Sequence, residues 1–235
     1  MIDGECQTFV NTLDSLTYAD RMTTTTPGKR GPYASTTKRR QTIVQAVVEL
    51  VDELGHENVT TALVSQRSGT SETTVLYHFP SKDHLLVAAL GAIEDDEADR
   101  AHVTLEDTLL DARAFRRLAD PDPHDPRFRL LNSMKGSASL AGHPAAEYFA
   151  QRNARIVDLF ARLLEHSQKA GLAHPNADPW LTARQVISVW DGLSQLWVSD
   201  PSFDLGAAVE DAVSKLIGQN LMAIQKLLGT SFNSS

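Results

Sequence analysis

The sequence has almost no cysteine, since Cys6 is the only one in 235 residues. An intramolecular disulfide is therefore impossible, and this composition is typical of a reducing compartment. Long hydrophobic runs are also missing: no apolar stretch approaches the roughly 20 residues of a membrane-crossing helix, and no apolar core of a signal peptide stands near the N-terminus. These absences predict a soluble, cytoplasmic protein with one large domain, or with a small domain and a larger companion.

Acidic side chains are absent between Arg21 and Val48, although the whole chain carries a net charge of -8. The same interval holds six basic residues, namely Arg21, Lys29, Arg30, Lys38, Arg39 and Arg40. Farther along, residues 93–99 (IEDDEAD) form an acidic block. One basic end on an acidic body indicates a local anion-binding surface, with a solvated basic tail as the alternative interpretation.

Strand signals are missing too, and most of the chain shows helical spacing. Residues 1–36 have little periodicity and predict a flexible basic arm, with Thr37 as the cap of the first helix. Met22 within this arm is an alternative start to Met1. An apolar stripe over residues 43–54 predicts a helix that ends at Gly55.

Two short helices are expected next. Thr60 is a suitable N-cap for a helix to about Ser68, and Gly69 makes the turn. Ser71 then caps a helix from Glu72 to about Phe79, in which Val75 and Phe79 point into a small core. After Pro80, a fourth helix starts at Lys82. Short helix, glycine turn and short helix are typical of a helix-turn-helix motif, whose second helix enters a DNA major groove.

The segments RRQTIVQAVVELVDELGHENVTT, SGTS and VLYHFPSK, in this order, resemble the N-terminal domain of tetracycline-repressor-type (TetR family) transcription regulators. The resemblance covers about residues 30–90. In that family an aromatic-His-Phe run ends the recognition helix, and a lysine that touches phosphate comes after it; Tyr77, His78, Phe79 and Lys82 occupy these positions here. Leu76 departs from the pattern, because the family often has a phosphate-binding tyrosine there. The resemblance implies an all-α regulator and not an enzyme.

Residues suited to DNA fall into two groups. Phosphate contacts are expected where cations or helix N-termini can reach the backbone, at Lys38, Arg39, Thr60, Thr61 and Lys82. Base contacts are expected along the second short helix, at Thr70, Ser71, Glu72, Thr73, Thr74, Tyr77 and His78. Alternatives stay open: Tyr77 and His78 as packing residues, Glu72 as a partner of the helix dipole, and Lys29 and Arg30 as a minor-groove arm or a screened one.

Residues 83–235 form the expected larger helical domain, after the arm (1–36) and the helix-turn-helix domain (37–82). Proline-rich loops separate expected helices at 144–169, 179–198 and about 205–228. The helix at 179–198 is apolar on two sides, so we expect it to be buried on two sides. The family resemblance implies that the last two long helices pair with those of a second copy, which gives a homodimer and a near-palindromic operator.

The same resemblance implies a small effector that binds the C-terminal domain and changes the distance between the two DNA-binding domains of the dimer. Candidate pocket residues mix aromatic walls with a few polar groups: Phe128, Met134, Phe149, Asn153, Phe160, Ser188, Trp190 and Asp191. The resulting hypothesis is a repressor that an unidentified small molecule releases from its operator, without cofactor or metal.

Two other classes of protein compete with this hypothesis. A dimeric helical adaptor would explain the long apolar faces but would leave the helix-turn-helix unused. An all-α metal-dependent enzyme is suggested by His143 and Glu147, four residues apart near a helix start, yet no third ligand has a telling spacing. A capping histidine is the simpler interpretation. Neither a nucleophile elbow nor a glycine-rich phosphate loop occurs in the sequence.

Overall fold

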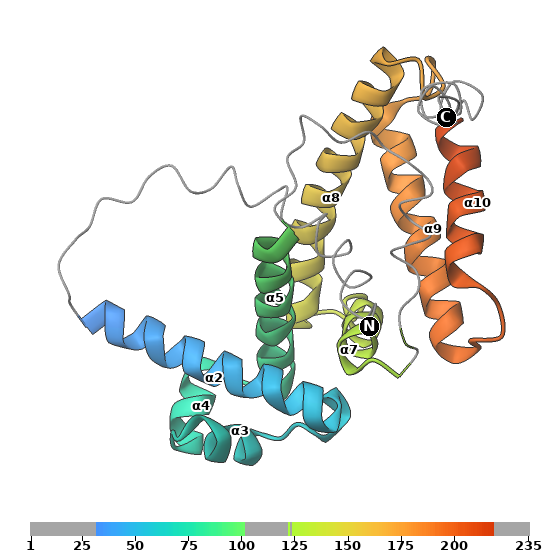
Figure 1. The fold of residues 1–235 in the computed structure, drawn as a ribbon. Coiled ribbons are helices and arrows are strands. Elements are labelled where there is room, and N and C mark those ends of the chain that lie inside the picture. Colours follow the sequence, from blue (N-terminus) through green and yellow to red (C-terminus); the bar gives the residue numbers. More distant parts are fainter. Residues whose placement is uncertain (1–31, 102–121, 123, 219–235) are drawn as a thin grey trace, which may run out of the picture. The chain divides into compact units, whose positions relative to one another are not determined.

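The computed structural model describes residues 32–101, 122 and 124–218, and within these ranges every regular element is a helix (Figure 1). The all-α prediction is thereby confirmed. The elements follow in chain order: α2 (Pro32–Leu54), the 3-10 helix η2 (His56–Asn58), α3 (Thr61–Ser68), α4 (Glu72–His78), α5 (Lys82–Ala101), α7 (Pro126–Ser137), α8 (Pro144–Lys169), α9 (Pro179–Ser199) and α10 (Leu205–Ile217). None of these helices combines the length and the apolar content that a membrane crossing requires.

The described helices belong to two compact units. The N-terminal unit contains α2 to α5, α7 and the start of α8 as far as Arg152. The C-terminal unit contains α8 from Asn153 onward together with α9 and α10. Compactness therefore does not separate residues 37–82 from α5 and α7, and the division at residue 82 stays a prediction about function.

One hydrophobic core holds the N-terminal unit together. Val75 of α4 and Phe79, which directly follows α4, are buried in it as expected, together with Val47 of α2 and Leu85 of α5. Leu130 of α7 is part of the same core. Since a fully buried side chain of this size contributes about 1.5–3 kcal/mol, the short helices are stabilised mainly by this packing.

The predicted helix ends between Gly55 and Ser71 are confirmed. Gly55 follows α2 with a φ of 78°, and Gly69 follows α3 with a φ of 65°, a left-handed conformation that glycine adopts without strain. The Thr60 hydroxyl accepts a hydrogen bond from Leu63 N at 3.3 Å. The Ser71 hydroxyl accepts one from Thr74 N at 3.2 Å.

Two expectations about helix ends were wrong, and one short helix was not expected at all. Thr37 lies inside α2, which starts at Pro32, because proline is favoured in the first turn of a helix. The 3-10 helix η2 was not expected. Helix α10, the last one among the described residues, ends at Ile217, since Gly218 takes a left-handed φ of 57° next to His174, where an added Cβ would lie 2.8 Å from His174 Cβ. Residues 1–31, with Met22, Lys29 and Arg30, and residues 219–228 lie outside the described residues.

Helix α9 is buried on one side within the chain, where we expected burial on two sides. Ala183, Val186 and Trp197 lie inward, and Trp197 Nε1 donates to Phe203 O at 3.1 Å. Leu181 and Leu196 are 54% and 62% exposed. Within the described residues, one face of α9 is therefore buried and these two leucines lie outside it.

Ion pairs join α2 to its neighbours in the N-terminal unit. Arg67 of α3 donates to both carboxylate oxygens of Glu53, at 2.8 and 2.6 Å, and to Glu49 at 3.3 Å. The hydrogen bond from Arg67 lowers the pKa of Glu53, and the two carboxylates raise the pKa of Arg67. Arg127 of α7 forms a bidentate ion pair with Asp52, with a distance of 2.7 Å for each hydrogen bond. These pairs are partly or fully exposed, so they fix geometry more than they add stability.

A buried carboxylate connects α5 to α8. Glu94 is 6% exposed; it accepts a hydrogen bond from Arg152 Nε at 2.6 Å and another from the Tyr148 hydroxyl. Arg152 is 5% exposed. Two enclosed charges are tolerable here because each satisfies the other with good geometry.

A second buried titratable group lies in η2. His56 Nδ1 lies 3.3 Å from Glu57 Oε2 and makes no hydrogen bond within the described residues. Burial lowers the pKa of His56; the Glu57 charge opposes this shift, whereas Lys82 and Arg129 add to it. The neutral imidazole is therefore the form that the fold favours.

The lowered pKa of His56 predicts a loss of stability in acid. Below about pH 6.5 the imidazole is protonated in the unfolded chain but stays neutral in the folded chain. As the pH falls from about 6.5 to the folded-state pKa, the free energy of unfolding therefore decreases, by at most about 1.4 kcal/mol per pH unit. The variant H56Q should lose less stability than the wild type between pH 7.5 and 5. Urea titrations followed by far-UV circular dichroism would measure this. Tryptophan fluorescence would report only on the C-terminal unit, because all three tryptophans, at 180, 190 and 197, lie in α9. H124Q, which removes an exposed histidine, is the control; an unchanged pH dependence in H56Q would contradict the prediction.

The Glu94 pair predicts an asymmetric double-mutant cycle. E94Q should cost about 3–5 kcal/mol, because it removes the Glu94 charge from beside the buried Arg152 guanidinium. Combining E94Q with R152M removes both charges and should restore most of that loss. Urea denaturation of the four proteins measures the cycle. Equal stability of E94Q and wild type would mean that the pair is not a buried constraint.

Candidate functional site

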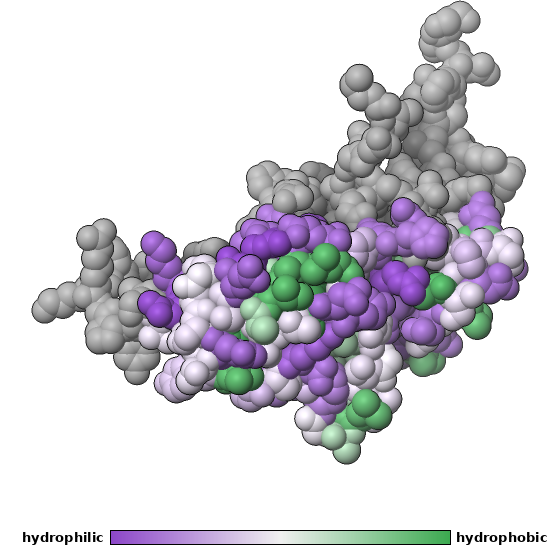
Figure 2. Space-filling model, turned by 90° about the horizontal axis from the view of Figure 1, so that it is seen from below, coloured by the Kyte–Doolittle hydropathy of each residue, from purple (hydrophilic) through white to green (hydrophobic). Residues whose placement is uncertain are grey.

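Helix α4 presents one face outward from the N-terminal unit. Its inner residues Val75 and Phe79 are buried, whereas Thr73, Leu76 and Tyr77 are exposed, Tyr77 to 82%. Viewed from the side of α3 and α4, the surface is mainly hydrophilic, with hydrophobic residues in separate spots (Figure 2). A short helix anchored by its inner face and open on its outer face is the form that reads a major groove.

Several polar residues expected to read bases are engaged within the motif. The Ser71 and Thr74 hydroxyls lie 2.8 Å apart, and the Thr70 hydroxyl lies 2.9 Å from that of Ser68. Glu72 accepts a hydrogen bond from the Thr61 hydroxyl, which braces α4 against α3. Thr73 and Tyr77 keep their exposed positions, with the Tyr77 ring edge-on to His78 at 5.2 Å between centroids.

Basic side chains surround this helix from other elements. Lys38 and Arg39 are exposed on α2. Lys82, at the start of α5, donates to Glu57 O at 2.6 Å, which places its ammonium group beside η2 with two further donors. The exposed N-cap Thr60 and the backbone N–H groups of the first turn of α3 add a partial positive charge.

Sequence reasoning missed Arg40 as part of this site. Its Nη1 donates to His78 O at 3.1 Å, and its guanidinium carbon lies 4.1 Å from the centroid of the Phe79 ring. Arg40 therefore holds the C-terminal end of α4. Arg40 and His78 are 38 positions apart, and no spacing rule predicts such a contact.

The suggested metal pair has another role. His143 Nδ1 accepts a hydrogen bond from Ala145 N at 3.2 Å, and Nε2 lies 3.4 Å from an Asp83 carboxylate oxygen. The capping interpretation of His143 is thus supported. Among the described residues, no group of three or more His, Cys, Asp or Glu side chains could hold a metal ion.

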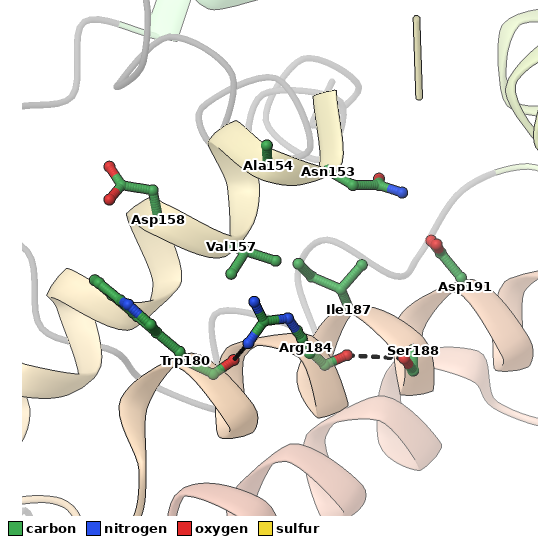
Figure 3. Close-up of a pocket in the computed structure, with 9 residues that line it drawn as sticks. All are labelled: Asn153, Ala154, Val157, Asp158, Trp180, Arg184, Ile187, Ser188 and Asp191. Carbon is green, nitrogen blue, oxygen red and sulfur yellow. Dashed lines mark hydrogen bonds between the residues drawn. The ribbon is translucent and has the colours of Figure 1, made fainter. Parts of the chain in front are cut away.

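A cavity of about 580 Å³ lies in the C-terminal unit between α8 and α9 (Figure 3). It brings together three of the residues proposed for the effector, Asn153, Ser188 and Asp191. The rest of its lining was not predicted: Ala154, Val157, Asp158, Trp180, Arg184 and Ile187. The i, i+4 spacing of Trp180, Arg184 and Ser188 on one helix could have pointed to them.

The other effector candidates do not line this cavity. Phe149 and Met134 belong to the core of the N-terminal unit, and Phe128 is buried in α7 of the same unit. Phe160 is buried in α8, and Trp190 is partly buried in α9. Large apolar side chains satisfy a core as well as a ligand, so the sequence alone did not separate the two uses.

Residues 43–89 match the family model of bacterial regulatory proteins of the tetR family. The matched segment spans α2 from Ile43, α3, α4 and the start of α5.

Two curated relatives match a larger part of the chain. The HTH-type transcriptional repressor KstR of Mycobacterium tuberculosis is 27% identical over 191 residues, which cover 77% of this chain and 81% of the relative. KstR of Rhodococcus jostii is 28% identical over 189 residues, with 77% and 84% covered. Among solved structures, a TetR transcription regulator from Haloarcula marismortui has a similar fold, with a TM-score of 0.59 at 18% identity over 77% of this chain and 97% of that one.

Proposed function

We infer that the chain, which belongs to the tetR family of bacterial regulatory proteins, is a sequence-specific DNA-binding transcriptional repressor that a small molecule releases from its operator. The observation that carries this function is α4, whose inner face is buried and whose outer face is exposed, in a chain similar to named repressors over 77% of its length. It is a regulator and not an enzyme.

We propose that DNA is contacted from several elements of the N-terminal unit. Lys38, Arg39, Lys82 and the α3 N-terminus with Thr60 and Thr61 would bind phosphate, and phosphate contacts set the register without specifying sequence. Thr73 and Tyr77 would read base edges, because they are the most outward residues of α4 with a methyl group or a phenol to offer. Thr70, Ser71, Glu72, Thr74 and His78 stay candidates with a secondary role, since each also supports the fold.

The exposed face of α9 supports a homodimer. Leu181 and Leu196 are large apolar residues that one chain leaves uncovered, and Gly192 lies between them on an exposed position of the helix. A second copy that applies the same face would bury them, as a twofold interface requires. A dimer with two reading heads implies two half-sites. We also propose a cytoplasmic location, where such a protein would meet its DNA.

The cavity between α8 and α9 supports the release step. Its volume is in the range of small-molecule sites, and apolar and polar residues line it together. A ligand shifts the repressor off DNA only if it binds the non-binding conformation more tightly. A helical adaptor without effector would not need this cavity and is the weaker alternative.

Selection of bound sequences from random double-stranded DNA tests the function directly. We expect enrichment of a near-palindrome whose half-sites lie roughly 34–36 Å, or a multiple of this, apart. Binding should weaken steeply with salt, as counterion release demands. If no motif is recovered and all sequences bind equally well, the proposal of a sequence-specific repressor is wrong.

Two substitutions distinguish residues that contact phosphate from residues that contact bases on the selected operator. K82A should weaken binding to every sequence and reduce the slope of log affinity against log salt by about one unit. T73A should instead change the preference at one base pair of each half-site and leave the salt slope in place. K215A, which removes a cation from α10, is the control. Electrophoretic shifts on matched and scrambled operators measure both effects, and identical behaviour of K82A and T73A would show that the two roles are wrongly assigned.

A further inference from the structure

The cavity between α8 and α9 has a distinct charge pattern. Arg184 extends from α9 into the space between the helices, on the side of Val157 (Figure 3). Its Nη1 donates to Trp180 O at 3.3 Å, and within the described residues no carboxylate forms an ion pair with it. Asp158, in contrast, is paired with Arg162 at 2.9 Å. On this side of the cavity a positive charge without a counter-ion therefore faces the ligand space.

Apolar groups stand beside that charge. Trp180 precedes Arg184 by one helical turn and has a partly exposed ring, while Val157 and Ile187 face each other from the two helices (Figure 3). Such walls accept a flat apolar body by burial and ring stacking. Together with Arg184 they fit an organic anion better than an inorganic one.

Hydrogen-bond acceptors gather at the other end of the cavity. The Asn153 Oδ1 atom is buried and has no hydrogen-bond partner among the described residues. The Ser188 hydroxyl gives its proton to Arg184 O at 2.8 Å, so its oxygen is left as an acceptor, and Asp191 lies one turn beyond Ile187 on the same lining. A buried acceptor without a donor is unfavourable, and a ligand hydroxyl would supply the donor.

The spacing of the lining residues along α9 gives the length of the cavity. Arg184 and Asp191 are seven residues apart on one helix, and Arg184 and Ser188 are four apart, which corresponds to roughly 6–10 Å at 1.5 Å per residue. A carboxylate and a hydroxyl at the two ends of one ring with a short side chain have this separation.

We propose that the effector is a small organic carboxylate whose carboxylate group pairs with Arg184, whose apolar body lies against Trp180, and whose hydroxyl donates to Asn153. The proposal rests on the function inferred above, and it adds the chemical class of the ligand. Arg184 would act as the specificity residue of the cavity, because a guanidinium binds a carboxylate with two parallel hydrogen bonds.

The test uses the full chain and a panel of hydroxylated aromatic carboxylic acids, with 4-hydroxycinnamate as the first member. Each acid is compared with its methyl ester, which has the same shape without the charge, and with choline as a cation. Isothermal titration should show at least about tenfold tighter binding of an acid than of its ester in the wild type. The variant R184Q should lose that preference, whereas K215Q, which removes an exposed cation from α10, should keep it.

The hydroxyl contact has its own control. N153L should weaken 4-hydroxycinnamate and leave cinnamate, which lacks the hydroxyl, unaffected. Circular dichroism and operator binding confirm that each variant is folded. Equal affinity of all acids and esters, tighter binding of choline, or an R184Q variant that binds acids as the wild type does would overturn the proposal.

Operator release distinguishes this proposal from the function on which it rests. If an acid binds through Arg184 but leaves the operator complex intact, the ligand class stands and the release mechanism fails. If an ester or choline releases the operator while no acid does, the release mechanism stands and the ligand class fails.

Discussion

An ion pair enclosed between α5 and α8 constrains how these two helices pack in the N-terminal unit, beside the hydrophobic core that holds the unit together. Because Glu94 and Arg152 are both buried, separating them would break a hydrogen bond between two desolvated charges, and this cost favours one register of the two helices. Helix α5 starts at Lys82, and α8 continues from Arg152 directly into Asn153 of the cavity. A ligand that displaces Asn153 would therefore act on the neighbour of the ion pair, and through it on the helix that begins with a lysine proposed to contact DNA.

Helix α4 has seven residues and would not be stable by itself, because so short a helix does not repay its nucleation. Its burial in the core through Val75 supplies most of its stability, and contacts at each end add to this. The Ser71 cap and the Thr61 bond to Glu72 hold its start, and Arg40 holds its end over Phe79. Polar side chains that a sequence suggests for base reading are thus first required by the fold, and fewer of them are left to specify DNA.

The helix-turn-helix could be predicted from the sequence because local rules decide it: glycine at a left-handed turn, hydroxyl caps, and apolar residues four apart. The ion pair of Glu94 and Arg152 could not be predicted from the sequence. The two residues are 58 positions apart, and Glu94 lies in an acidic block typical of a solvated surface. The cavity was predicted in part. Asn153, Ser188 and Asp191 were recognised by type, but Asp158, Trp180 and Arg184 depend on how α8 and α9 pack, which periodicity does not give.

Leu76 stands where the family often has a tyrosine, and helix geometry prevents Tyr77 from replacing that residue. Successive residues of a helix differ by about 100° around its axis, so the phenol of Tyr77 does not take the position that a tyrosine at residue 76 would have. Tyr77 is instead the most exposed large hydrophobic residue of α4, and Leu76 beside it is exposed as well. An apolar and an aromatic side chain side by side fit base edges better than phosphate. The phosphate contacts proposed above then rest on Lys82, the α3 N-terminus and the basic start of α2, and the outer face of α4 is left for base edges.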